Sequence, residues 1–275
     1  MQHLELGQLG IVAAKEFKDR LRSRWVIAAA AVFTVFALVI AFFGTASEGA
    51  VGLQGLDATI ASLVSLVIYL VPLIALILGY DAVVGESERG SLDLLLSMPI
   101  TRVEFLLGKF CGLAAALATA TLAGFGLVGG IFAWTLGLGA MAPYAVFMAS
   151  TLALGWIFLS LAVALSVAAK SRVTAIGLAV ALWFFYVLVY DLMLLGSLVA
   201  DDGRYSGAVL PFALMLNPTD VYRLTNIAAL PDMRALYGLA TVVPDALGRP
   251  LLLGGVLALW IAVPLFAAHR LLEVK

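Results

Sequence analysis

Two Tyr-Asp pairs are the first residues whose type and spacing point to chemistry, because intramembrane aspartyl proteases carry such pairs. Tyr80-Asp81 and Tyr190-Asp191 lie at the end of, or within, apolar stretches. A protease of this class also needs a Gly-x-Gly-Asp motif, and the nearest match, at 137–140, reads Gly-Leu-Gly-Ala. Ala140 stands where that motif has its aspartate, so the sequence lacks one of the two motifs that such a protease needs. Asp191 therefore needs another explanation, either a structural hydrogen bond or a transport role.

No other catalytic or cofactor-binding motif is found in the sequence. Val103 stands where a phosphate-binding loop ending at Gly108-Lys109 would begin with glycine. Two histidines and one cysteine are too few for an all-protein zinc or copper site. Four methionines could meet Cu(I), although methionine more often fills gaps between helices: Met141, Met193, Met215 and Met233. We expect no catalytic residue, no metal ligand and no cofactor bound by this chain.

The composition is that of an integral membrane protein. Of 275 residues, 64% are hydrophobic and only 12% are charged, against roughly 45–50% and 25% in soluble domains. So few charged side chains cannot cover the surface of a soluble domain of this size, which excludes a soluble enzyme. The net charge of −1 gives no basic footprint for nucleic acid. The expected surroundings are a lipid bilayer.

Uncharged stretches predict an all-α membrane protein with six transmembrane helices in a single domain, 1–275. A span needs about 20 apolar residues, and the 60-residue stretch 110–169 without charges suits two spans. The expected spans are 25–47, 58–80, 102–133, 144–169, 173–199 and 250–268. Twelve Lys and Arg residues fall on the side of both termini and four on the other side. This excess predicts that both termini are cytoplasmic.

The segment before the first span predicts an amphipathic helix at 8–24 that lies along the membrane interface. Its apolar stripe includes Leu9, Phe17 and Leu21, and its polar side includes Lys15 and Arg22. The alternative is a basic flank that only fixes the topology. Small-residue spacings in the third span, Gly108 to Gly112 and Gly126 to Gly130, permit close helix contact within or between chains.

The cytoplasmic segment 81–101 predicts a short helix held between turns. Gly85 and Gly90 permit sharp turns, Pro99 ends the helix, and Thr101 with Glu104 fits a capping box for the next helix. Its leucines lie beside charged side chains outside the membrane. Such a helix either docks a soluble partner or packs its leucines back onto the bundle, and the spacing alone does not decide between the two.

The long segment 200–249 on the opposite side predicts a capped helix after Asn217-Pro218. The segment either caps the bundle or holds another protein. In the second interpretation, Val221 and Leu224 supply the apolar core of an interface, and Asp220 and Arg223 its polar rim. We expect six residues to contact a periplasmic partner: Asn217, Pro218, Asp220, Val221, Arg223 and Leu224.

The segment from Gly79-Tyr80-Asp81 to Gly108-Lys109 resembles the hallmark of ABC-2 type permeases. The shared order is an acidic residue, Gly90-Ser91, a leucine run, Pro99 and Gly-Lys. It covers about 30 residues, and Ser91 stands where many relatives have threonine. Within the family, the run from Trp25 to Glu86 and the stretch Leu216–Arg223 are similar to the permeases that serve maturation of nitrous oxide reductase.

The resemblance implies a type V exporter-like permease fold and several partners. They are a second copy of the chain, a cytoplasmic ATPase subunit that carries ATP and magnesium, and a periplasmic protein, in the bacterial inner membrane. It also implies that 86–98 is a coupling helix seated on the ATPase, with a second contact near the loop after the fourth span. The expected contact residues are Glu86, Glu88, Arg89, Gly90, Ser91, Asp93, Leu95, Leu96, Lys170 and Arg172.

Two other functions remain open at this point. A generic ABC-2 exporter of a lipid, drug or sulfur compound would share every feature except the match at Leu216–Arg223. A channel or secondary transporter would need paired charges inside the membrane, and Asp191 alone qualifies.

Overall fold

The computed structural model describes residues 6–22, 24–44, 55–200, 210–230 and 249–274, and this part of the chain is helical without any strand. The helices that span or approach the bundle are α1 (Leu6–Leu21), α2 (Arg24–Phe43), α3 (Leu56–Gly79), α6 (Arg102–Leu136), α7 (Ala142–Ala168), α8 (Arg172–Phe184), α9 (Tyr190–Ala200) and α12 (Pro250–Val274). Shorter helices are α4 (Val84–Glu88), α5 (Ser91–Leu96), η2 (Leu138–Ala140), η3 (Phe185–Val189), α10 (Leu210–Met215) and α11 (Pro218–Ala229). Six helical stretches are long and apolar enough to cross a membrane, which confirms the all-α, six-span prediction for this part of the chain.

The observed bounds differ from the expected spans mainly at the ends. Helix α6 has 35 residues, or about 52 Å at 1.5 Å per residue, against a hydrocarbon core of about 30 Å. It therefore extends beyond the bilayer. Helix α12 continues past residue 268 to Val274, where Arg270 pairs with Glu273 on the helix surface. Polar residues end a span without ending the helix, so charge counting underestimates helix length.

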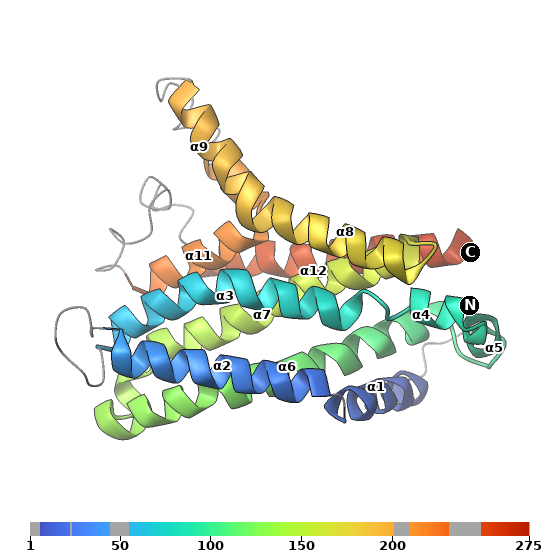
Figure 1. Cartoon of the computed structure of the whole chain (residues 1–275), viewed down its shortest axis with the longest axis horizontal. Coiled ribbons are helices and arrows are strands. Elements are labelled where there is room, and N and C mark those ends of the chain that lie inside the picture. Colours follow the sequence, from blue (N-terminus) through green and yellow to red (C-terminus); the bar gives the residue numbers. More distant parts are fainter. Residues whose placement is uncertain (1–5, 23, 45–54, 201–209, 231–248, 275) are drawn as a thin grey trace.

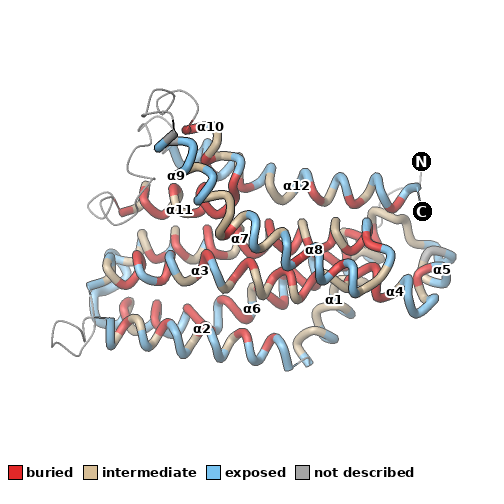
Figure 2. The backbone as a smooth tube through the Cα atoms, turned by 45° about the horizontal axis from the view of Figure 1, so that its top comes forward, coloured by how far each residue is buried: buried red, intermediate tan, exposed pale blue. Residues whose placement is uncertain are grey.

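Helices α6 and α7 form the centre of the bundle. Helices α1 and α2 lie end to end along α6, while α3 and α12 lie along α7 (Figure 1). Buried residues gather on the inward sides of α3, α6 and α7, whereas the outer side of α8 is exposed (Figure 2). In the centre, Phe33 stacks on Phe125 with ring centroids 5.0 Å apart, and Phe125 meets Phe147 edge-on at 5.5 Å.

Helix α1 packs on α6 through two glycines. A Cβ atom at Gly108 would lie 2.7 Å from Val12 Cβ, and one at Gly112 would lie 2.6 Å from the carbonyl oxygen of Ala13. The Gly108 to Gly112 spacing therefore serves a contact within the chain. Gly126 and Gly130, in contrast, have no atom within 4 Å of such a Cβ. The expected placement of α1 along a membrane interface is not tested by this packing and stays a prediction.

The bundle has two distinct ends. The proximal end carries α1, α4 and α5 together with the C-terminus, and the distal end carries α11 and the turn between α6 and α7 (Figure 1). The fifth span bends at η3, a π-helical turn, and α9 leaves the bundle there. A π turn leaves a carbonyl without its usual helical partner, and Asn217 Nδ2 donates to the carbonyl of Tyr186 at 3.1 Å. Helix α11 thereby holds the bend.

Replacing Gly112 with valine should loosen α1, because the new Cβ would overlap the backbone of α1 rather than a flexible side chain. Overpacking of this kind lowers the free energy of unfolding by about 1–3 kcal/mol. The midpoint of thermal unfolding in detergent should fall, and the N-terminal residues should become sensitive to protease. Gly126→Val is the matched control, since open space surrounds that position, and equal behaviour of the two variants would contradict the packing argument.

Candidate functional site

The segment between α3 and α6 forms a compact knob at the proximal end. Helix α5 begins after Gly90, whose φ of +70° lies in the left-handed region that glycine tolerates. The capping box that starts α6 is confirmed, because Glu104 N–H donates to Thr101 Oγ1 at 3.2 Å and Thr101 N–H donates to Glu104 Oε2 at 2.8 Å. The knob consists of residues 84–100, which are α4, α5 and the turn that follows, and the capping box fixes its connection to α6.

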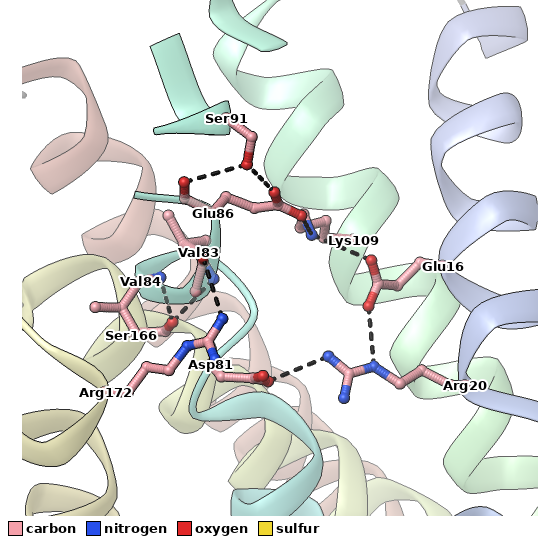
Figure 3. A network of polar contacts seen from close by, with 11 residues as sticks. Glu16, Arg20, Asp81, Val83, Val84, Glu86, Ser91, Lys109, Ser166 and Arg172 are labelled. Atoms are coloured by element: carbon pink, nitrogen blue, oxygen red, sulfur yellow. Dashed lines mark hydrogen bonds and ion pairs between the residues drawn. The ribbon is translucent and has the colours of Figure 1, made fainter. Parts of the chain in front are cut away.

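A chain of ion pairs attaches the knob to α1 and α6 (Figure 3). Arg20 Nη2 lies 3.2 Å from Asp81 Oδ1, and Arg20 Nε lies 3.0 Å from Glu16 Oε1. Lys109 Nζ lies 3.1 Å from Glu16 Oε2 and 3.1 Å from Glu86 Oε1. We call these five residues the proximal ion-pair chain. It joins the end of α3, helix α1, helix α6 and helix α4 in one continuous path.

Lys109 is the central member of this chain because it is the most deeply buried. Its side chain is 8% exposed, while those of Glu16 and Glu86 are 12% and 19% exposed. A buried ammonium group loses its hydration, so it needs charged partners in direct contact. Burial alone would lower the pKa of Arg20, but the neighbouring carboxylates of Asp81 and Glu16 raise it above its ordinary value. Arg20 therefore stays charged.

The other side of the knob is attached to α7 and α8. Ser166 Oγ, on α7, accepts hydrogen bonds from the backbone N–H groups of Val83 at 2.9 Å and Val84 at 3.0 Å. Arg172 N–H donates to Glu88 Oε1 at 2.7 Å, so the Glu88 carboxylate satisfies a free amide at the start of α8. The Arg172 guanidinium reaches the Gly85 carbonyl at 3.3 Å. The knob therefore contacts α6, α7 and α8 through polar side chains, and α1 by way of Lys109.

The structure separates the ten residues expected at an ATPase contact into three groups. Four of them form hydrogen bonds or ion pairs within the chain: Glu86, Glu88, Ser91 and Arg172. The Ser91 hydroxyl donates to Glu86. The exposed residues are Arg89, Gly90, Asp93 and Lys170. Leu95 packs partly against the core, and the side chain of Leu96 lies outside the described part. The contact itself stays a prediction.

The apolar residues that the knob presents outward are Leu94, which is 65% exposed, and Met98, which is 46% exposed. Leu92 points inward and is buried. The expected contact residues were Leu95 and Leu96 instead, because periodicity within a six-residue helix does not indicate which face meets the bundle. Glu16, Arg20 and Ser166 were not expected at the site, and Lys109 was named only as part of the Gly-Lys pair. Their only signal in the sequence was the presence of charged or polar residues beside apolar spans.

The residues expected at a periplasmic contact are mostly buried in the chain itself. Val221 and Leu224, expected as the apolar core of an interface, pack inside the bundle, and Asn217, Pro218 and Asp220 are also buried. This corrects the expectation that these side chains are available at the surface. The packing agrees with a segment that caps the bundle, and contact with a periplasmic partner stays a prediction. Residues 201–209 and 231–248 of the segment lie outside the described part.

Arg223 takes part in a second, partly buried cluster of charges. Its Nη2 atom lies 3.1 Å from Asp191 Oδ2, and its Nη1 atom lies 2.6 Å from Asp220 Oδ1. Asn217 Nδ2 donates to Asp220 Oδ2 at 3.0 Å. Asp191, the acid inside the fifth span, thus has a structural partner of opposite charge. The cluster fixes α11 to the bend of the fifth span.

Comparison with known proteins agrees with this architecture. The model of the ABC-2 family transporter protein matches residues 11–273. The chain belongs to the ABC-2 transporter family. It is 46% identical over 268 residues to the probable ABC transporter permease protein NosY of Pseudomonas aeruginosa, covering 94% of this chain and 96% of the relative. It is 42% identical over 278 residues to the protein of the same name from Stutzerimonas stutzeri, covering 97% and 98%.

Membership in the family makes this ABC-2 chain a permease, the membrane-spanning part of an ABC transporter. The family match begins within α1, includes the knob and ends within α12. Within the described residues, no group of three or more His, Cys, Asp or Glu side chains is placed to hold a metal ion.

Replacing Lys109 with methionine should destabilise the permease strongly, because the partly buried Glu86 would lose its ion-pair partner and Glu16 would keep only Arg20. Breaking a buried pair in this way lowers the free energy of unfolding by about 3–5 kcal/mol. Thermal unfolding in detergent, followed by tryptophan fluorescence, measures the loss.

The matched control is Arg270→Met, which removes a cation from an exposed pair with Glu273 and should cost no more than about 1 kcal/mol. Adding Glu86→Gln to Lys109→Met should restore part of the stability, because it removes the carboxylate that lost its cation. Equal losses for Lys109→Met and Arg270→Met would show that the chain of ion pairs carries no special weight.

Proposed function

We propose that this chain is the permease subunit through which a separate cytoplasmic ATPase, similar to NosF, acts on a periplasmic partner, similar to NosD, during copper-site assembly of nitrous oxide reductase. ATP and magnesium belong to the ATPase, and this chain contributes no catalytic residue and binds no cofactor. The names of the two relatives support this assignment. The observation that carries the coupling role is the knob, an exposed apolar surface tied to four helices.

The exposed face of the knob is suited to a soluble ATPase. Leu94 and Met98 supply an apolar centre, and Arg89 and Asp93 supply charges at its edge. Glu86 and Glu88 support this face from the side of the bundle, because their carboxylates hold the knob to Lys109 and Arg172. In this arrangement, movement of the ATPase reaches the membrane helices through rigid ionic contacts.

The second copy of the chain would pack against the fifth span. Only 11% of the most apolar part of this span is buried within the chain, against 56% for α6 and 61% for α7. Its exposed apolar residues include Val173, Val180 and Phe184. The excess of positive residues beside the knob supports a cytoplasmic proximal end, with both termini in the cytoplasm of a bacterial inner membrane.

The periplasmic partner would then meet the distal end. Because Val221 and Leu224 are buried, α11 acts in this proposal mainly as a support for the surface. Phe212 and Leu216, which are 75% and 63% exposed on and after α10, provide apolar contact area beside it. Arg223, Asp220, Asn217 and Pro218 keep that surface in place.

Replacing Leu94 and Met98 together with aspartate should detach the ATPase, because the apolar centre of the contact would become negative. The permease should remain inserted and keep its thermal stability, since both side chains project away from the bundle. Copurification of the ATPase in mild detergent measures the result. Val274→Asp, at an exposed position near the C-terminus, is the control, and retention of the ATPase by the double variant would contradict the docking proposal.

Loss of the permease gene should leave nitrous oxide reductase without its copper sites, because the proposed function serves their assembly. Copper content and the absorption spectrum of purified reductase measure this outcome in a strain that carries the deletion. The intact chain should restore the copper sites, and the Leu94→Asp, Met98→Asp variant should not. A fully metallated reductase in the deletion strain would overturn the assignment and favour a generic exporter.

A further inference from the structure

An open groove lies between α7, α11 and α12 in the distal half of the bundle. It has a volume of about 420 Å³ and is lined mainly by small and apolar side chains. Ala149 and Ala153 line it on α7, Ala228 on α11, and Gly254 and Ala258 on α12. The volume falls within the roughly 300–1,000 Å³ of small-molecule sites. The groove exists because small residues on three helices leave space that no other part of the described chain fills.

The groove lies between two membrane spans, α7 and α12, and the short helix α11, so its surroundings decide what fills it. Its lining on α12 runs from Pro250 to Ile261, which is about 17 Å of helix, or roughly half of the hydrocarbon thickness. Polar atoms beside it are already bonded: Ser150 Oγ donates to the Phe147 carbonyl and Thr225 Oγ1 donates to the Val221 carbonyl. An apolar groove at this depth favours an apolar occupant.

The shape of the groove suits a flexible chain. Its lining follows α12 for about 17 Å, a path that an extended hydrocarbon chain can take. A helix from a second copy is the competing occupant, and the disulfide experiment below distinguishes the two.

The distal end of the groove carries a positive charge. Arg249 is exposed and immediately precedes Pro250, which lines the groove at the start of α12. A guanidinium at the membrane surface attracts the phosphate of a lipid headgroup. We propose that a phospholipid of the distal leaflet binds here, with an acyl chain in the groove between α7, α11 and α12 and its phosphate at Arg249.

Photocrosslinking in vesicles tests the proposal on the full-length chain. The probe is phosphatidylglycerol with a diazirine on one acyl chain, present as a trace in vesicles of phosphatidylethanolamine and phosphatidylglycerol. The unaltered chain should crosslink at 146–156 and 250–261 in preference to the open face of α6 that carries Gly126 and Gly130. Equal labelling of the groove and of the α6 face would overturn the proposal without any variant.

A matched pair of neighbouring glycines sharpens the test. Gly254→Trp should fill the groove and lower crosslinking there by about tenfold, whereas Gly255→Trp should leave it unchanged. A Cβ atom at either glycine meets no atom within 4 Å, and only Gly254 lines the groove. Similar crosslinking in the two variants would show that the lipid is not held in the groove.

Two further variants test the headgroup contact and the possibility that a second copy of the chain fills the groove. Arg249→Gln should lower crosslinking of the anionic probe by about fivefold, the effect of one basic residue at an anionic surface. If the substitution left crosslinking unchanged, Arg249 would not belong to the proposed site. Ala258→Cys, with Cys111→Ser, reports on protein in the groove: efficient disulfide formation between two copies on oxidation would assign the groove to a second copy and overturn the lipid proposal.

Discussion

The buried charge of Lys109 is the constraint on which the proximal half of the structure depends. An ammonium group with 8% of its side chain exposed is stable only beside carboxylates, because burial removes most of its hydration. Glu16 and Glu86 provide them, and they come from α1 and α4, which are separated by two membrane spans in the sequence. Satisfying one charge thus fixes the N-terminal helix and the knob to α6 at the same time. An apolar interface would allow these short elements to slide, whereas directional ion pairs hold them in one position.

The distal half of the structure solves a similar problem with different residues. At the bend in η3, the Tyr186 carbonyl accepts a hydrogen bond from the Asn217 side chain. Asp191 in the same span requires a cation, which Arg223 supplies. Arg223 and Asn217 both belong to the region of α11, so one short helix satisfies both requirements. This explains why α11 is buried although it lies in a segment that charge counting assigns to the outside. The polar cluster and the bend depend on each other, since removing α11 would expose both Asp191 and an unpaired carbonyl to apolar surroundings.

Small residues on one helix can pack closely against a neighbour at one position and face open space at another. Gly108 and Gly112 bring the backbones of α1 and α6 together, whereas Gly126 and Gly130 face open space one helical stretch later. On α12, Gly254 lines a groove while its neighbour Gly255 does not. A small residue permits contact but does not require it, because the facing element decides whether the space is filled. In the proposals above, a second copy completes the surface of the fifth span and a lipid completes that of the groove on α12.

The sequence by itself determined the features that depend on local composition and spacing. Twenty-residue apolar stretches identify the six spans because each span must satisfy its backbone internally and match the bilayer. Thr101 with Glu104 identifies the start of α6, and Gly90 identifies the turn before α5, because capping and positive φ are decided within a few residues. Only the tertiary structure decided that Lys109 pairs with Glu16 and Glu86, that Arg223 pairs with Asp191, and that Leu94 rather than Leu95 projects outward. These outcomes join residues from helices far apart in the chain, and no local pattern encodes which distant partner completes a buried charge or covers a helix face.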